Sequence, residues 1–129
     1  MYDHLNSRQK ENYNFHKVAA VLADYGYTSI RLSDDWQSAD FIAQHVDGQT
    51  FLKVQLKGRM SIDKKYIGRG LHICFPYNNS WYLFPHDEVV DYLLNSSTIG
   101  NTSSWQEQGA YSFKVISQEY LKYFEQFRL

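Results

Sequence analysis

Cysteine and long apolar runs are scarce in this chain of 129 residues. The single cysteine, Cys74, excludes an internal disulfide and any zinc site built from several cysteines. No apolar run approaches the roughly 20 residues that span a membrane, and the polar start at residues 1–4 lacks a secretory signal pattern. We therefore expect a protein of the reducing cytoplasm that has no membrane partner.

A strong net charge is also missing, since the formal charge at pH 7 is −1. This argues against a basic architectural nucleic-acid binder. The segment Gly68-Arg69-Gly70 lacks the further glycines and the strand-to-helix context of a phosphate-binding loop. Zinc is not indicated either, because no pair of histidines has the spacing of metal ligands on one helical turn. The five histidines are His4, His16, His45, His72 and His86.

The composition fits one compact α/β domain spanning residues 1–129. A hydrophobic fraction of 43% is enough to bury a core in a chain of this length without disulfides. Periodicity, capping residues and turn residues predict the elements. We expect helices over residues 5–25, 85–94 and 117–127, strands over residues 27–32, 39–46, 51–57, 71–75 and 81–84, and loops over residues 33–36, 58–70 and 95–104.

Asp47-Gly48 stands between two alternating segments and predicts a hairpin with a type I′ turn. If these two residues form the loop, Asp40 faces Gln55 across the two strands, and Lys57 lies two residues further along the same face. Directly opposed side chains are about 5 Å apart at Cβ, and a neighbour two residues along is within about 7 Å. The three side chains can therefore converge on one small ion or phosphate.

The two faces of this hairpin differ in polarity. One face carries an apolar stripe, which we expect to pack against helices. The other face carries Asp40, Gln55 and Lys57, and a solvated strand face is the ordinary interpretation of such a pattern. Ile42 and Phe51 share this face, which favours the floor of a semi-buried cleft instead. The apolar stripe consists of Phe41, Ala43, Leu52, Val54 and Leu56.

Asp40, Gln55 and Lys57, spaced as Asp-x(14)-Gln-x-Lys across a hairpin, resemble the core motif of the PD-(D/E)XK nuclease superfamily. Restriction enzymes, Holliday-junction resolvases and some intron-encoded homing endonucleases belong to it. The proline that often precedes the aspartate is Ala39 here. The usual second carboxylate is replaced by Gln55, a Gln-x-Lys variant that some active relatives carry. The resemblance covers roughly residues 5–94.

The resemblance implies an α/β, restriction endonuclease-like fold, with a mixed central β-sheet, an αβββ core and flanking helices. It implies a metal-dependent DNA endonuclease, with DNA as partner and Mg²⁺ or Mn²⁺ as cofactor. The Asp40 carboxylate, the Gln55 amide and the main-chain carbonyl of Leu56 would be metal ligands. Lys57 would position a water molecule and stabilise developing charge. Glu11 is the best match for the acidic residue on the preceding helix that helps to complete the metal site.

Glu11 has two interpretations from the sequence alone. It lies four residues before Phe15, which places it on the inward face of the predicted helix, where a carboxylate needs a cation nearby. Alternatively, it is an exposed acid at the start of the helix, next to Lys10. The sequence leaves both open.

Positive charge is concentrated between Lys53 and Arg69. These 17 residues hold six basic residues against Asp63 alone, a formal charge of +5. A solvated loop is one interpretation, and a rim that tracks the phosphates of DNA is the other. Tyr66 in this segment is interpreted as a core or surface aromatic, or as a ring that could stack on a base. The predicted nucleic-acid contacts are Lys53, Arg59, Lys64, Lys65 and Arg69.

Two other functions remain open from the sequence. The near-neutral charge and Gln55 are compatible with a non-catalytic module that keeps the nuclease-like fold and binds nucleic acid or protein. A structural or inhibitory protein could use Trp105 and Tyr111 as a dimerising aromatic surface. A homodimer is compatible with each of these functions.

Overall fold

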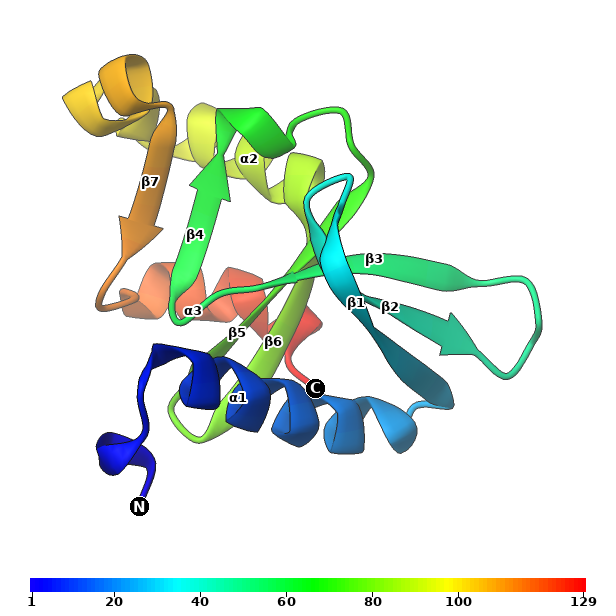
Figure 1. Ribbon diagram of the computed structural model, residues 1–129. Helices are drawn as coiled ribbons and strands as arrows, with labels where there is room; N and C mark the ends of the chain where they lie inside the picture. Colours follow the sequence, from blue (N-terminus) through cyan, green and yellow to red (C-terminus); the bar gives the residue numbers. More distant parts are fainter.

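One long helix precedes a run of six strands, and two further helices flank the last strand along the chain (Figure 1). The computed structural model describes the backbone of residues 1–129 and all side chains except those of Asp35 and Trp36. Within this described part, no helix is both long and apolar enough to cross a membrane. The elements are α1 (Ser7–Ala23), β1 (Tyr27–Trp36), β2 (Ala39–His45), β3 (Phe51–Leu56), β4 (Met60–Asp63), β5 (Leu71–Tyr77), β6 (Ser80–Pro85), α2 (His86–Ser96), β7 (Ala110–Phe113) and α3 (Gln118–Phe124), with short helical turns at Tyr2–His4, Lys64–Tyr66, Ile99–Asn101, Ser104–Gln108 and Glu125–Phe127.

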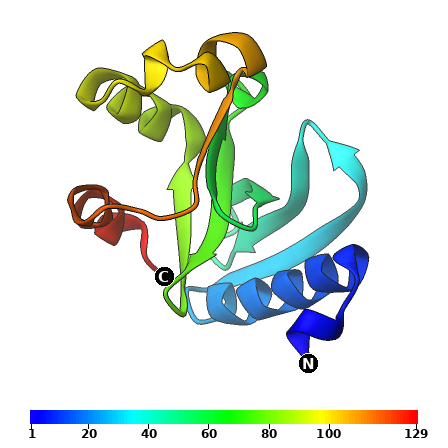
Figure 2. The ribbon, with the colours of Figure 1, turned by 90° about the vertical axis from the view of Figure 1, so that its left-hand side faces the viewer.

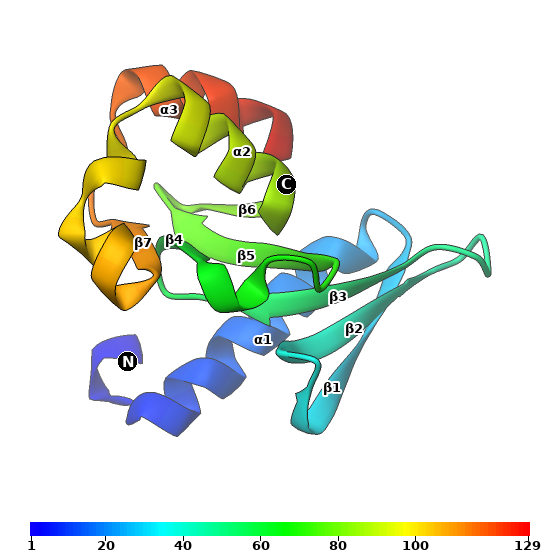
Figure 3. The ribbon, with the colours of Figure 1, turned by 90° about the horizontal axis from the view of Figure 1, so that it is seen from above.

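A five-stranded mixed sheet forms the centre, in the order β1-β2-β3-β5-β6. The strands β1, β2 and β3 are antiparallel neighbours, β5 runs parallel to β3, and β6 is antiparallel to β5. Seen from above, α1 lies on one side of this sheet, and α2 and α3 lie on the other (Figure 3). The predicted fold class, a mixed α/β domain in which a helix precedes three sequential strands, is confirmed.

α1 is defined by its caps and by one apolar face. Its N-terminus is a capping box, in which Asn6 accepts a hydrogen bond from the N–H of Gln9 and the Gln9 side chain accepts one from the N–H of Asn6. Beyond its C-terminus, Gly26 has a φ of +86° and turns the chain into β1. The buried residues Phe15, Val18 and Leu22 of the helix pack with Phe41, Ala43, Val54 and Cys74 of the sheet.

The other face of the sheet carries a larger core that is rich in aromatic residues. The ring of Phe75 packs against the rings of Tyr82, Phe84 and Phe124, at centroid distances of 5.2, 5.9 and 6.0 Å. Leu93 of α2 is fully buried in the same cluster. Residues of α2 and α3, far along the chain, therefore pack on β5 and β6 and stabilise this part of the sheet.

The β2–β3 hairpin has the predicted register. Phe41 pairs with Val54, and one more step along the same ladder places Asp40 across from Gln55. Phe41 and Val54 are fully buried on the α1 side, whereas Asp40 and Gln55 are half-buried. Because successive side chains alternate between faces, the acid and the amide point away from that apolar stripe.

The loop that closes this hairpin differs from the prediction. The N–H of His45 bonds to the carbonyl of Thr50 at 2.9 Å, and the N–H of Gly48 bonds to the carbonyl of His45 at 3.2 Å. Gly48 has a φ of +72°, but Asp47 does not have a positive φ, so the predicted type I′ turn is wrong. Asp47 instead accepts hydrogen bonds from the Thr50 hydroxyl and from the N–H groups of Thr50 and Gln49, which hold its pKa well below its usual range. A loop two residues longer preserves the register because the side-chain period of a strand is two.

Left-handed residue pairs occur at two other hairpins. Gln37 and Ser38 have φ values of 51° and 70°, and Asn78 and Asn79 have values of 48° and 61°. The predicted turn at Asn78-Asn79 is confirmed. The predicted loop over residues 33–36 is wrong, because β1 continues to residue 36 and turns directly into β2. Pairing with β2 outweighs the polar composition of this segment.

The basic segment over residues 58–70 is not the single loop that was predicted. It contains β4, which pairs with β7 in a separate two-stranded sheet. Met60 and Ile62 of β4 are buried, so this segment also contributes to the core. Neither strand was predicted, because four-residue strands with distant partners give a weak local signal.

Candidate active site

Four residues that the sequence singles out line one pocket, which we call the site pocket. Glu11 comes from α1, Asp40 from β2, and Gln55 and Lys57 from the end of β3 and the residue directly after it. The pocket has a volume of about 710 Å³ and is partly open to solvent. The paired ends of β2 and β3 therefore bring three polar side chains next to the first turns of α1.

Asp40 is held in place by the main chain of β3. Its Oδ2 accepts a hydrogen bond of 2.8 Å from the N–H of Leu56, and the carboxylate is half-buried. At this point a side chain, instead of a carbonyl of β2, accepts the strand N–H. One carboxylate oxygen is thereby fixed beside the main chain of Leu56.

Lys57 lines the site pocket and also contacts an aromatic ring. Its N–H bonds to the carbonyl of Cys74 at 2.8 Å, which fixes its backbone to β5. Its Nζ lies 5.3 Å from the ring centroid of Tyr66, and Nζ of Lys65 lies 5.2 Å from the same ring, within the range of cation–π attraction. Tyr66 is only 3% exposed, so it is a core aromatic, and the alternative in which its ring stacks on a base is wrong. The ring instead supports the two lysines.

Glu11 is exposed, so of its two interpretations the exposed acid near the start of the helix is confirmed, and the inward-facing one is wrong. It nevertheless lines the site pocket, and it lines a neighbouring pocket of about 510 Å³ together with Asp40 and Arg31. The two carboxylates thus share two adjoining pockets. The role of Glu11 in completing a metal site stays a prediction.

The oxygen atoms available in the site pocket are hard ligands. They belong to the carboxylates of Glu11 and Asp40, the amide of Gln55 and the main chain of Leu56. Such donors suit Mg²⁺ or Mn²⁺ and not a metal that prefers thiolates. The described residues contain no group of three or more His, Cys, Asp or Glu side chains that could hold a metal ion. Only two of these ligands, the carboxylates of Glu11 and Asp40, carry a charge. The Gln55 amide and the Leu56 carbonyl would have to complete the coordination of an ion.

Two further cations line the site pocket, and sequence reasoning missed both. Lys10 comes from α1 and Arg31 from β1. Arg31 pairs with Phe41 across the strands, its guanidinium lies 5.4 Å from the ring centroid of Phe15, and it donates a hydrogen bond to Asn12. With Lys57, the pocket lining has three basic and two acidic side chains, a formal charge of +1. The register of β1 against β2 would have revealed Arg31, but it depends on the unpredicted turn after residue 36.

The five basic residues predicted to contact nucleic acid lie outside the site pocket. Arg59, Lys64, Lys65 and Arg69 are exposed on the segment that follows Lys57. The fifth of these residues, Lys53, is half-buried on β3, and its Nζ donates a hydrogen bond of 3.0 Å to the Gln37 side chain. The segment that begins at the site pocket therefore carries four exposed basic side chains on the protein surface.

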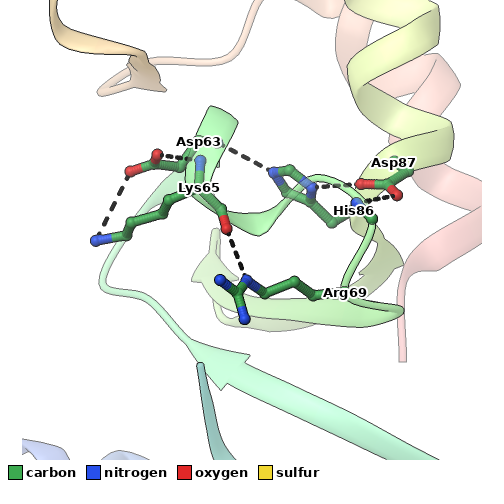
Figure 4. Close-up of polar contacts among 6 residues, drawn as sticks. Asp63, Lys65, Arg69, His86 and Asp87 are labelled. Atoms are coloured by element: carbon green, nitrogen blue, oxygen red, sulfur yellow. Dashed lines mark hydrogen bonds and ion pairs between the residues drawn. The ribbon is translucent and has the colours of Figure 1, made fainter. Parts of the chain in front are cut away.

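This basic segment is tied down by its own side chains. Lys65 forms an ion pair with Asp63 at 3.9 Å, and Nε of Arg69 donates to the carbonyl of Lys65 at 3.0 Å (Figure 4). Nζ of Lys64 lies 5.3 Å from the ring centroid of Trp105. Trp105 is only 5% exposed, so its predicted place on an exposed dimerising surface is wrong.

His86, at the start of α2, joins the basic segment to the core (Figure 4). Its Nε2 accepts a hydrogen bond of 3.0 Å from the N–H of Asp63, so its Nδ1 carries the proton and donates to Asp87 at 3.0 Å. Asp87 also accepts from the N–H of Gly68 at 2.9 Å. Partial burial acts to raise the pKa of Asp87, but the hydrogen bonds from His86 and Gly68 outweigh it and hold the pKa below 3.8. The edge of the Tyr66 ring packs on the fully buried imidazole.

Comparisons with protein-family models and with curated proteins give no match. Among solved structures, the chain is similar to Hjc, a Holliday junction resolvase from the archaeal hyperthermophile Archaeoglobus fulgidus. The sequence identity is 14% and the TM-score is 0.48, over 60% of this chain and 74% of the resolvase chain.

Proposed function

We propose that this protein is a metal-dependent endonuclease that hydrolyses phosphodiester bonds of DNA in the site pocket. The observation that carries the proposal is the convergence of Glu11, Asp40, Gln55 and Lys57, from three different elements, on one pocket. Two carboxylates, one amide and one lysine in that order along the chain form the pattern that resembles the PD-(D/E)XK nucleases. The positive formal charge of the lining also favours an anionic substrate.

Asp40 and Gln55 would hold one Mg²⁺ or Mn²⁺ ion, with the carbonyl of Leu56 and the carboxylate of Glu11 completing the ligands. The hydrogen bond from the Leu56 N–H restricts the orientation of Asp40, which lowers the entropy lost when a ligand is bound. A divalent cation held there would act as a Lewis acid and offset negative charge on the scissile phosphate. Glu11 matters more than usual, because Gln55 supplies no charge.

Lys57 would position the attacking water and stabilise the charge that develops on the phosphate oxygens. Its contact with Tyr66 limits the directions that its long side chain can take. Lys10 and Arg31 would neutralise and orient the substrate phosphate from the helix and edge-strand sides of the pocket. A water molecule and a phosphate can thus be held among three cations.

The exposed cations that follow Lys57 would track the DNA backbone away from the site. Arg59, Lys64, Lys65 and Arg69 are exposed, and their segment is anchored through His86. Phosphate contacts of this kind supply most of the affinity that does not depend on sequence. Lys53 could join them only by giving up its bond to Gln37.

A non-catalytic nucleic-acid-binding module is the second candidate. It is favoured by one observation, the lack of a group of three or more metal-binding side chains among the described residues. In that case the basic segment would bind DNA, and the site pocket would have no ion to hold. The two candidates make different predictions for cleavage and for metal binding.

The activity test compares cleavage of plasmid, duplex and branched DNA in Mg²⁺, Mn²⁺ and EDTA. We expect cleavage that requires the metal, and a loss on the order of 100-fold or more in Asp40→Asn and in Lys57→Met. Matched controls are Asp91→Asn and Lys114→Met, which change exposed residues outside the site pocket and should leave the rate unchanged. Equal cleavage by the site variants and their controls would show that the site pocket is not the nuclease centre.

A further inference from the structure

A second groove adjoins the site pocket along α1, and we call it the Tyr13 groove. Its volume is about 550 Å³, and it lies between α1 with the preceding helical turn and the turn that joins β5 to β6 (Figures 1 and 2). Tyr2 and Asn14 line both the groove and the site pocket, so the two cavities share a border. The groove is lined chiefly by Tyr2, Tyr13, Lys17, Tyr77, Asn79 and Trp81.

Two exposed aromatic rings stand at this border, each accompanied by a lysine. Tyr2 is 37% exposed and Tyr13 is 41% exposed, and their ring centroids are 5.1 Å apart at a tilt of 56°. Nζ of Lys10 lies 5.1 Å from the Tyr2 ring, and Nζ of Lys17 lies 5.4 Å from the Tyr13 ring. The Asn14 amide donates a hydrogen bond of 3.2 Å to the Tyr2 hydroxyl, which ties the N-terminal turn to α1.

The lining of the groove has the chemistry of a site for an unpaired nucleotide. Aromatic side chains supply stacking surfaces, and the amides of Asn78 and Asn79 supply donors and acceptors for base edges. Lys17 is the charged residue of the lining, which contains no Asp or Glu, so the groove is compatible with a phosphate. We infer that the Tyr13 groove binds a single-stranded segment of DNA.

The Tyr13 groove lies beside the site pocket, so one DNA strand can reach both; this step rests on the proposed function. Glu11 and Lys17 are six residues apart on one helix, a rise of about 9 Å, which matches two to three stacked nucleotides at about 3.4 Å each. A strand whose phosphodiester lies in the site pocket can therefore place a nearby unpaired base in the groove. The substrate class would be DNA with a single-stranded segment next to the cleaved bond, such as an overhang, a flap or a branch.

The binding test uses a labelled 15-nucleotide oligothymidine and a blunt 15-base-pair duplex, with fluorescence anisotropy in EDTA so that no cleavage occurs. We expect Tyr13→Leu to weaken oligothymidine binding about tenfold, because loss of one stacking contact has an effect of this order. Lys17→Ala should also weaken oligothymidine binding, and it should lower the slope of log affinity against log salt by about 0.7. Duplex affinity should stay within about twofold in both variants.

Matched controls change an exposed tyrosine and an exposed lysine elsewhere. Tyr25 is 49% exposed beyond the other end of α1, and Lys122 is exposed on α3. Tyr25→Leu and Lys122→Ala should bind oligothymidine like the parent. Equal oligothymidine affinity in the parent, Tyr13→Leu and Lys17→Ala would overturn the inference, as would a parent that does not bind the oligonucleotide.

Cleavage separates this inference from the proposed function. If the parent cuts DNA, the rate ratio between overhang and blunt substrates should fall towards one in Tyr13→Leu, while the blunt rate is unchanged. A ratio that stays the same would contradict the inference and leave the nuclease activity standing. A parent that cuts no DNA but loses oligothymidine binding in Tyr13→Leu would contradict the nuclease and support the groove.

Discussion

The carboxylate of Asp40 accepts a hydrogen bond from the main-chain N–H of Leu56. The residue that we assign to the metal also closes the end of the β2–β3 ladder. A partly buried N–H without an acceptor costs roughly 1–3 kcal/mol. Function and stability are therefore coupled at this position.

Asp40→Ala should lower the free energy of unfolding by about 1 kcal/mol, whereas Asp40→Asn, which keeps an acceptor oxygen, should lower it by less. Urea unfolding of the two variants measures the difference. If Asp40→Ala is as stable as the parent, the Leu56 N–H must have another acceptor. Asp40→Asn is thus the better variant for activity assays, because it separates the lost charge from the lost hydrogen bond.

Alternation and register made the hairpin predictable, even though the turn type was wrong. Asp40 and Gln55 fall opposite each other with a two-residue or a four-residue loop, so the error in the turn did not move the site. Local sequence could not reveal β4 and β7, which pair over almost 50 residues. It also could not reveal that Arg31 lines the site pocket, since this depends on the register of β1 against β2 and on the unpredicted turn that joins them.

Burial was harder to infer than position. Glu11 lines the site pocket but is exposed, and helical spacing from Phe15 alone could not distinguish this from the inward-facing alternative. The sequence left Tyr66 as either a core or a surface aromatic, and the structure packs it on His86. The network that anchors the basic segment joins residues from two elements, and no local pattern in the sequence encodes it.

Asp87→Asn should reveal a pH-dependent anchor of the basic segment. The pKa of Asp87 in the folded protein is lowered from its ordinary value of 3.8, so the ionised form stabilises the fold above that value. This contribution is lost as the pH falls through the lowered pKa. Urea midpoints of parent and Asp87→Asn should differ at pH 6 and converge once the pH is below the lowered pKa of Asp87. Asp91→Asn, on the same helix, is the control and should match the parent at pH 6. A difference that is constant with pH would contradict this role.

Lys64→Ala combined with Lys65→Ala should weaken binding to duplex DNA and reduce its salt dependence. Loss of two phosphate contacts lowers the slope of log affinity against log salt by about 2. The measurement is a salt series of anisotropy titrations in EDTA. Lys114→Ala combined with Lys122→Ala removes the same charge from the C-terminal segment and serves as the control. Equal slopes in the two double variants would show that Lys64 and Lys65 do not contact the DNA.

Gln55→Glu distinguishes a metal ligand from a solvated strand residue. If Gln55 is a ligand, the change replaces an amide dipole with a carboxylate and should tighten metal binding. Gln44→Glu is the matched control, because Gln44 lies on the same face of the hairpin but lines a different pocket, near the loop. It adds the same charge without adding a ligand to the site pocket.

The most direct measurement is a Mn²⁺ titration of the protein without DNA, in which electron paramagnetic resonance counts the free ion. The parent and Gln44→Glu should bind one ion with equal affinity, and Gln55→Glu should bind it more tightly. Asp40→Asn should abolish binding. Undetectable binding by the parent and by Gln55→Glu would contradict the metal site, and with it the proposal that this protein is a metal-dependent nuclease.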